Sequence, residues 1–243
     1  MTPLEQLASI MNERYISEDE DEYKVELMAG LSDQEIDRFK DRLSSKRIPD
    51  EIKELLKFAG GFGFYGLDYV TFGLNEFSGF EEIFPFSIEL ASDGFGNFWI
   101  LDILPNGDWS HVYYVCHDPA VIIKHSENLA EFIYHVHEFG STPERSNLNI
   151  IHEQTIMDIW QTNQGLIAVN EAAQSTDNLL RDFAQSFTNN FQIADLRNKP
   201  NRSGFAWGKF CVNLESAKRH PTELLWAIEK NAPKSFFKRL FGH

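Results

Sequence analysis

Residues 91–102 have the sequence ASDGFGNFWILD, in which Gly94 and Gly96 stand just before an aromatic and β-branched segment. Glycine adopts positive φ angles without a steric penalty, and the side chains of Asp93 and Asn97 can hydrogen-bond to turn amides. The stretch therefore predicts a tight connection that leads into a strand of a sheet. A calcium or phosphate loop is the alternative, but a cation needs more oxygen ligands at fixed spacing than these residues supply.

The segments around this turn alternate between strand-like and turn-like composition. Aromatic and β-branched residues dominate Tyr69–Phe72, Phe98–Leu101 and His111–Val115, and Gly, Asn, Asp and Pro lie between them. Asn106–Gly107 is a residue pair typical of a hairpin connection. We expect successive strands of one sheet, with antiparallel pairing across Asn106–Gly107.

Helical patterns precede the sheet. Leu4–Tyr15 has apolar residues at helical spacing and is followed by the acidic run 18–22, which we interpret as a solvated loop. Ser32 and Glu35 have the spacing of a capping box at a helix start. A second helix is expected over Ile52–Ala59, where the apolar residues share one face.

A further helix closes this part of the chain. It begins after Asn128, carries an apolar face and ends at the sequence Gly140–Pro143. We therefore predict two parts: a domain at residues 1–142 and a smaller α+β extension at residues 143–243.

The extension mixes both kinds of element. Ile150–Trp160 and Leu179–Phe187 have helical spacing, Phe191–Phe210 contains two strand-like pieces, and Thr222–Lys230 is predicted to be helical. The basic and aromatic tail Phe236–Phe241 is expected to dock on this part rather than to anchor in a membrane surface. The fold class is α+β, with helices packed on an antiparallel or mixed sheet.

Residues 30–138 resemble the SUKH superfamily of Smi/Knr-type proteins, because several short motifs of that superfamily occur here in the same order. In chain order they are Gly30-Leu31-Ser32 with Glu35-Ile36, Ile48-Pro49-Asp50 with Leu55-Leu56, Gly60-Gly61, Ala91-Ser92-Asp93-Gly94 with Gly96-Asn97 and Leu101-Asp102, Val112-Tyr113-Tyr114 with His117-Asp118, and Leu129 with Phe132-Ile133. The chain departs from the pattern at Ala59, where the family has Asn, and at Ile52, where it has Tyr. The resemblance implies a scaffold for diverse protein partners, found widely as immunity proteins of bacterial toxin systems, without a conserved active site.

Composition points to a globular protein of a reducing compartment. Hydrophobic residues make up 42% of the chain and charged residues 24%, which is the balance of a protein with a packed core. The N-terminus lacks a signal-peptide pattern, and no apolar run approaches the roughly 20 residues that cross a bilayer. Cys116 and Cys211 form no C-x-x-C motif. We expect a soluble, cytoplasmic protein.

The charge of the chain is unevenly distributed. Residues 1–140 contain 27 acids and 10 bases, whereas residues 141–243 contain 10 acids and 12 bases. Within residues 61–140, 12 acids face a single base, Lys124. A negative field of this kind repels nucleic acid and anionic lipid, and it accelerates encounter with a cationic protein.

These observations together predict a non-enzymatic immunity protein that occupies a cognate, basic bacterial toxin, with a nuclease as one possibility. The acids expected to contribute, through charge complementarity only, are Glu81, Glu82, Glu89, Asp93, Asp102, Asp108 and Asp118. Two alternatives stay open: a housekeeping interaction scaffold of the same fold, and a small hydrolase.

A dinucleotide site is disfavoured by its context. Gly61–Gly66 satisfies the letters of the fingerprint, and Glu81 and Glu82 lie near the spacing of a ribose-binding acid. The fingerprint needs a strand before it and a helix after it, whereas here a helix precedes and strand-like residues follow. We interpret these glycines as a helix exit.

Neither a metal nor a cofactor is expected. On a helix, His135 and His137 point to nearly opposite sides. His111, His117 and His125 can converge through the sheet, but no cysteine pair or H-E-x-x-H motif accompanies them. No Gly-x-Ser-x-Gly segment is present, and paired acids arise by chance in so acidic a chain, so no catalytic residue is assigned.

Overall fold

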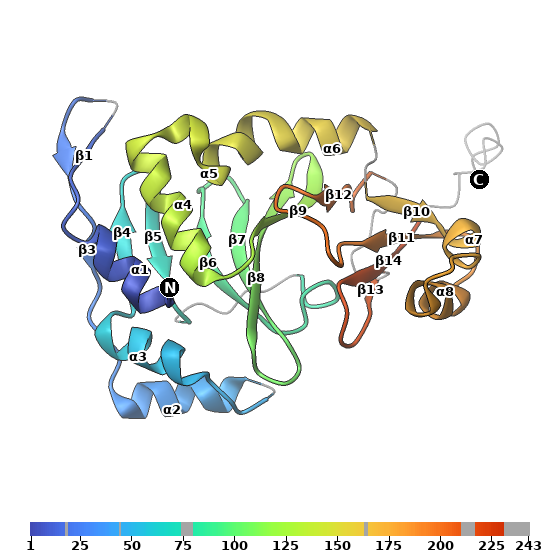
Figure 1. Cartoon of the computed structure of the whole chain (residues 1–243), viewed down its shortest axis with the longest axis horizontal. Coiled ribbons are helices and arrows are strands. Elements are labelled where there is room, and N and C mark those ends of the chain that lie inside the picture. Colours follow the sequence, from blue (N-terminus) through green and yellow to red (C-terminus); the bar gives the residue numbers. More distant parts are fainter. Residues whose placement is uncertain (18, 44, 74–79, 163–164, 210–216, 231–243) are drawn as a thin grey trace, which may run out of the picture.

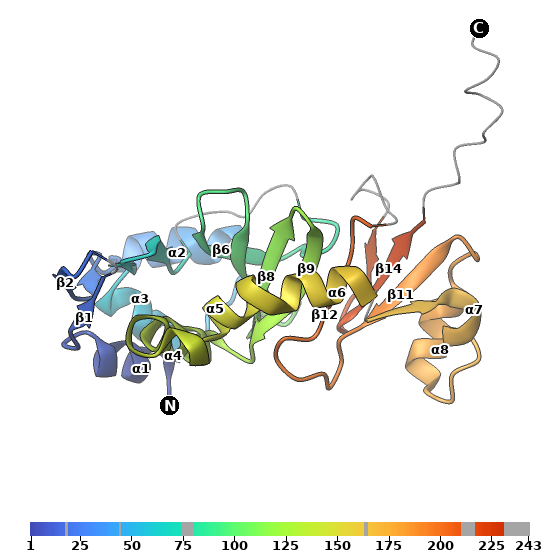
Figure 2. The same cartoon turned by 90° about the horizontal axis from the view of Figure 1, so that it is seen from above.

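A computed structural model describes the chain except for residues 18, 44, 74–79, 163–164, 210–216 and 231–243. Its parts follow one another along a single long axis (Figure 1), and the view from above shows the same order (Figure 2). Helices and a small sheet form one end, and a five-stranded sheet lies in the middle. A four-stranded sheet with two helices forms the other end.

The N-terminal helices begin where local chemistry favours a helix start. Their bounds, with those of the hairpin between them, are α1 (Pro3–Ile10), β1 (Tyr15–Ile16), β2 (Glu22–Tyr23), α2 (Asp33–Arg42) and α3 (Asp50–Phe58). The predicted capping box is confirmed, since Ser32 accepts from the Glu35 amide and the Glu35 carboxylate accepts from the Ser32 amide. In the acidic run, residues 19–21 are exposed in the turn of the β1–β2 hairpin, and Glu22 is exposed at the start of β2.

A three-stranded sheet joins one strand that precedes α2 with two strands that follow α3. It has the order β3-β4-β5 and consists of β3 (Glu26–Leu27), β4 (Gly61–Phe64) and β5 (Leu67–Thr71). Because α3 leads directly into β4, the glycines at residues 60–61 form the helix exit that the sequence predicts. The dinucleotide fingerprint would require a helix after these glycines, but β4 is followed by strand β5.

The central sheet is antiparallel throughout, with the order β12-β9-β8-β7-β6. Its strands are β6 (Ser87–Ser92), β7 (Phe98–Ile103), β8 (Trp109–His117), β9 (Ala120–Ser126) and β12 (Gly204–Phe205). The predicted hairpin joins β7 to β8, and Gly107 in its turn has a φ of +86°. Two strands of this sheet, β6 and β9, were not predicted from the sequence.

Helices cover one face of this sheet (Figure 2). They include α4 (Leu129–Ser141), the 3-10 turn Pro143–Arg145, α5 (Asn147–Ile150), the π-helical turn Ile151–Thr155 and α6 (Ile156–Thr162). Leu101, Tyr114 and Ile123 from three neighbouring strands share one buried cluster with Phe132 and Ile159 from the helices. In the described part of the chain, no helix has the length and apolar character needed to cross a membrane.

The C-terminal sheet has the order β10-β11-β14-β13. Its elements, with two helices on its outer face, are β10 (Leu166–Ala168), α7 (Val169–Ala172), α8 (Asn178–Gln185), β11 (Phe191–Asp195), β13 (Lys218–Arg219) and β14 (Leu225–Glu229). The predicted helix over Thr222–Lys230 is wrong, because β14 occupies its centre and pairs with β11. Leu225, Trp226, Ala227 and Ile228 are all buried, and a short apolar run buried on both sides has no periodicity that separates strand from helix.

The second face of the central sheet packs against the C-terminal sheet. Ile100, Tyr113 and Ile122 share a buried cluster with Trp226 and Ile228. Alternate residues of β8 therefore enter two cores, since successive side chains of a strand point to opposite faces. The α+β class, with a C-terminal α+β extension, is confirmed.

Candidate partner-binding surface

Asp102 is not a surface residue, so the expectation that it contributes to an acidic surface is wrong. Its side chain is fully buried and accepts two hydrogen bonds from Arg219, at 2.6 Å and 2.5 Å. The guanidinium also lies over the rings of Phe84 and Trp226. Burial opposes the charge of Arg219, but Asp102 more than offsets it, so the pKa of Arg219 is raised.

Two other candidate acids face cations at the protein surface. Asp108 lies 3.1 Å from the Arg47 guanidinium, and Glu82 lies 3.2 Å from the Lys218 ammonium. In both pairs each side chain is about half exposed, so the pair carries little net charge toward a partner.

Glu81 and Glu89 lie near the edge of the central sheet. Glu81 is exposed in the segment before β6, whereas Glu89 is partly buried on β6 itself. Burial raises the pKa of Glu89, which favours the neutral carboxyl over the carboxylate. Glu89 is therefore less accessible to a partner than the exposed Glu81.

Asp93 and Asp118 share one end of the central sheet. Asp93 begins the β6–β7 turn and Asp118 lies in the β8–β9 turn, and these turns are adjacent because His117 donates its amide to Asn97 Oδ1 at 3.1 Å. Within the described ranges, no lysine or arginine pairs with either carboxylate. The structure thus brings together two of the seven candidate acids without neutralising them.

Internal hydrogen bonds hold the β6–β7 turn. Asp93 Oδ1 accepts from the amides of Phe95 at 2.9 Å and Asn97 at 3.2 Å, and Asp93 Oδ2 accepts from Asn97 Nδ2 at 2.6 Å. Gly94 and Gly96 have φ angles of +74° and +86°. The positive φ of both glycines and the role of the Asp93 side chain are as the sequence predicts, whereas Asn97 Oδ1 accepts from the His117 amide of β8 rather than from a turn amide.

Phe95 occupies the tip of this turn, with 81% of its surface exposed. Phe95 was not among the residues predicted to bind a partner. The sequence does contain an indication that Phe95 is unusual: it is an aromatic residue between two turn glycines, where small or polar residues are usual.

Lys124, the single base of residues 61–140, is not at the surface. Its side chain is 4% exposed, and its ammonium donates to Glu127 Oε1 at 2.7 Å and to the Lys199 carbonyl at 3.0 Å. The acidic excess of this region is therefore left without its own exposed cation.

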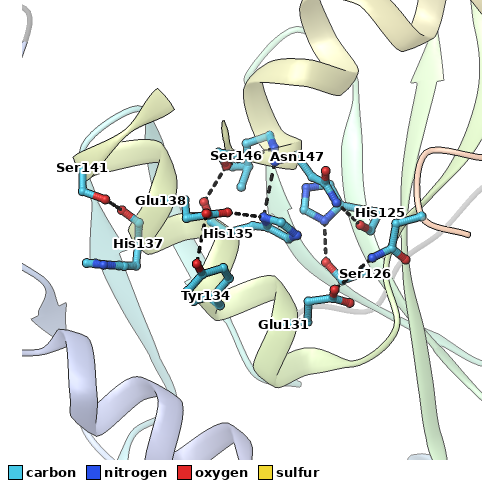
Figure 3. Close-up of polar contacts among 12 residues, drawn as sticks. His125, Ser126, Glu131, Tyr134, His135, His137, Glu138, Ser141, Ser146 and Asn147 are labelled. Atoms are coloured by element: carbon cyan, nitrogen blue, oxygen red, sulfur yellow. Dashed lines mark hydrogen bonds and ion pairs between the residues drawn. The ribbon is translucent and has the colours of Figure 1, made fainter. Parts of the chain in front are cut away.

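A buried histidine network lies on the helical side of the central sheet (Figure 3). The His125 ring is 2.7 Å from Ser126 Oγ and packs edge-on against the His135 ring, with centroids 5.6 Å apart. His135 in turn lies 2.9 Å from Glu138 Oε2. Both His125 and Ser126 are completely buried, so this serine–histidine pair lacks the solvent access that a nucleophile needs.

The same network fixes the start of α5. Ser146 Oγ donates to the His135 carbonyl at 2.6 Å, and Asn147 Nδ2 donates to the His125 carbonyl at 2.8 Å (Figure 3). Burial lowers the pKa of His125 well below its usual value, and the neighbouring His135 lowers it further. Burial also lowers the pKa of His135, although Glu138 acts in the opposite direction.

His111, His117 and His137 do not join this network. His111 contacts the Glu127 carbonyl and His117 contacts Asn97, so these two do not converge with His125 as one alternative required. His137 turns away from His135 toward the Tyr15 hydroxyl. Among the described residues, no three His, Cys, Asp or Glu side chains lie close enough together to hold a metal ion.

Comparison with known proteins finds one relationship. The sequence model of the SMI1 / KNR4 family (SUKH-1) matches residues 30–135, which run from the start of the capping-box helix to the middle of α4. No curated protein and no solved structure matches the chain significantly. The match covers the landmarks from Gly30 to Ile133, including the β6–β7 turn. Residues 30–135 of this chain are therefore a SMI1/KNR4 (SUKH-1) family domain.

Proposed function

We propose that this protein is a non-enzymatic immunity protein that binds a basic toxin domain and blocks its active surface. The SUKH-1 domain supports an immunity-type role. The electrostatic part of the proposal rests on one observation: the acidic excess of residues 61–140 has no exposed base of its own, because Lys124 is buried against Glu127. Unneutralised negative charge speeds encounter with a cationic partner and disfavours nucleic acid.

The experiment that tests this function is capture of the partner. Tagged full-length protein is used in pull-downs from the native bacterium at low and at high salt, since the Debye length shrinks from about 10 Å at 0.1 M to about 3 Å at 1 M. We expect stoichiometric, salt-sensitive capture of a basic toxin domain. Co-expression with the full-length protein should then restore growth to cells that produce that domain.

The main alternative is a housekeeping scaffold that uses the same domain to assemble other proteins. Capture of a housekeeping complex at both salt concentrations would favour that role. Growth arrest by the captured domain despite stoichiometric binding would contradict the immunity proposal, because binding would then leave the toxin active.

A further inference from the structure

Described elements of the chain pack on both faces of the central sheet. Helices, among them α4 and α6, cover one face, and the C-terminal sheet covers the other through Tyr113 and Trp226. A protein that docks on this sheet must therefore approach its edges or the turns at its ends.

The two ends of the sheet differ in charge. At the β7–β8 end, Arg47 neutralises Asp108 and donates to the Asn106 carbonyl. At the opposite end, Asp93 and Asp118 have no lysine or arginine partner among the described residues. Only the second of these two ends presents unneutralised negative charge from the candidate acids.

Phe95 protrudes from this second end. Its side chain is 81% exposed, and its backbone lies in the turn that Asp93 holds. Tyr114 Oη reinforces the turn with a hydrogen bond to Asp93 Oδ2 at 3.3 Å, and a Cβ added at Gly96 would lie 3.3 Å from the His117 ring. A ring held on a pre-formed turn loses little conformational freedom when it is buried by a partner, which is a property of interface hot spots.

We infer that Phe95 is the aromatic anchor of the partner interface, flanked by the Asp93 and Asp118 carboxylates. The partner that fits has an apolar pocket for one aromatic ring, bordered by lysine or arginine side chains. Charge complementarity selects this occupant, because the two carboxylates disfavour an acidic surface around the same pocket. The inference rests on the proposed function for the identity of the partner, but not for the location of the contact.

Site-specific photo-crosslinking tests the location in the native bacterium. The full-length chain carries p-benzoylphenylalanine in place of Phe95, or, as a matched control, in place of Tyr69, which is 62% exposed on β5. Irradiated cells should yield one discrete adduct from the position-95 variant and none from the position-69 variant. Mass spectrometry of the adduct should identify a protein whose crosslinked peptide lies among lysine and arginine residues.

The outcomes separate the inference from the proposed function. A toxin crosslinked through position 69 alone would contradict the inference that Phe95 is the anchor, but it would still support the immunity function. A basic protein that is not a toxin, crosslinked through position 95, would support the anchor and contradict the immunity function. An adduct of the chain with itself, an adduct with an acidic surface, or no adduct at position 95 would overturn the inference.

Binding kinetics with the protein identified in the adduct supply a second measurement. Phe95→Ala should weaken affinity at least about tenfold, mainly through faster dissociation, whereas Tyr69→Ala should leave it unchanged. Asp118→Lys should slow association at low salt, and Glu171→Lys, which changes the net charge equally on α7, should not. Equal effects of Phe95→Ala and Tyr69→Ala would overturn the anchor.

Discussion

Asp102 and Arg219 form a two-pronged ion pair across 117 positions of sequence, with N–O distances of 2.6 Å and 2.5 Å. Asp102 lies on β7 of the family domain, and Arg219 lies on β13 of the C-terminal extension. The Asp102 side chain is fully buried and that of Arg219 is 8% exposed, so neither charge has water as an alternative partner. The pair therefore ties the two parts of the chain together.

Breaking this pair should destabilise the protein strongly. Asp102→Asn and Arg219→Met each leave an uncompensated buried group, which costs about 3–5 kcal/mol of unfolding free energy. The double variant should lose less than the sum of the two, because the residues share one interaction. Urea unfolding measures all three. The control is Glu82→Ala at the neighbouring exposed pair with Lys218, for which we expect a loss of less than about 1 kcal/mol.

The buried contact also predicts how the isolated N-terminal part behaves. A fragment of residues 1–142 lacks the sheet that covers Ile100, Tyr113 and Ile122, and it leaves Asp102 without its cation. We expect this fragment to bind a hydrophobic dye and to unfold without a cooperative transition. Residues 1–230, which keep the whole described core, should unfold cooperatively. A fragment of residues 1–142 as stable as the full chain would show that the two parts are independent domains.

Local chemistry explains which parts of the fold were predictable. The Ser32 capping box, the Asn106–Gly107 hairpin and the turn from Asp93 to Asn97 depend on residues within a few positions of one another. The same interactions form in the structure, and long-range contacts such as that of the Tyr114 hydroxyl with Asp93 add to them.

Long-range pairing explains what was not predictable. β14 forms because β11 and β13 hydrogen-bond to it on its two sides. The sequence of residues 225–229 alone does not indicate which strands pair with it. Likewise, counting charges identified Asp102 as an acid but could not reveal the arginine that buries it. Asp93 and Asp118 lie in turns, and turn positions are usually at the surface.

The histidine network predicts that stability falls as the solution becomes acidic. Burial lowers the pKa values of His125 and His135 in the folded protein, so below the ordinary histidine pKa of about 6.5 the unfolded chain binds protons that the folded chain does not. Each such histidine removes about 1.4 kcal/mol of unfolding free energy per pH unit, from about pH 6.5 down to its folded-state pKa. Urea unfolding between neutral and mildly acidic pH measures the slope.

Two variants assign this slope to the network. His135→Gln keeps a hydrogen-bond donor for Glu138 but removes one proton-binding group, so it should reduce the pH dependence. Ser146→Ala removes the hydrogen bond to the His135 carbonyl without removing a titratable group. It should therefore lower the unfolding free energy by a similar amount at neutral and at mildly acidic pH. If the unfolding free energy of His135→Gln depends on pH as strongly as that of the unchanged protein, His135 does not contribute to the pH dependence.

The last prediction concerns the two glycines of the turn that carries Phe95. Both have positive φ, so alanine at either position is strained by about 1–2 kcal/mol. They differ in surroundings: a Cβ at Gly94 meets nothing within 4 Å, whereas a Cβ at Gly96 lies 3.3 Å from the His117 ring. Gly96→Ala must therefore also shift the His117 ring, which contacts Asn97, and we expect it to lower the unfolding free energy by up to about 1 kcal/mol more than Gly94→Ala. Thermal and urea unfolding of the two variants test this difference, and equal losses would mean that His117 does not brace the turn.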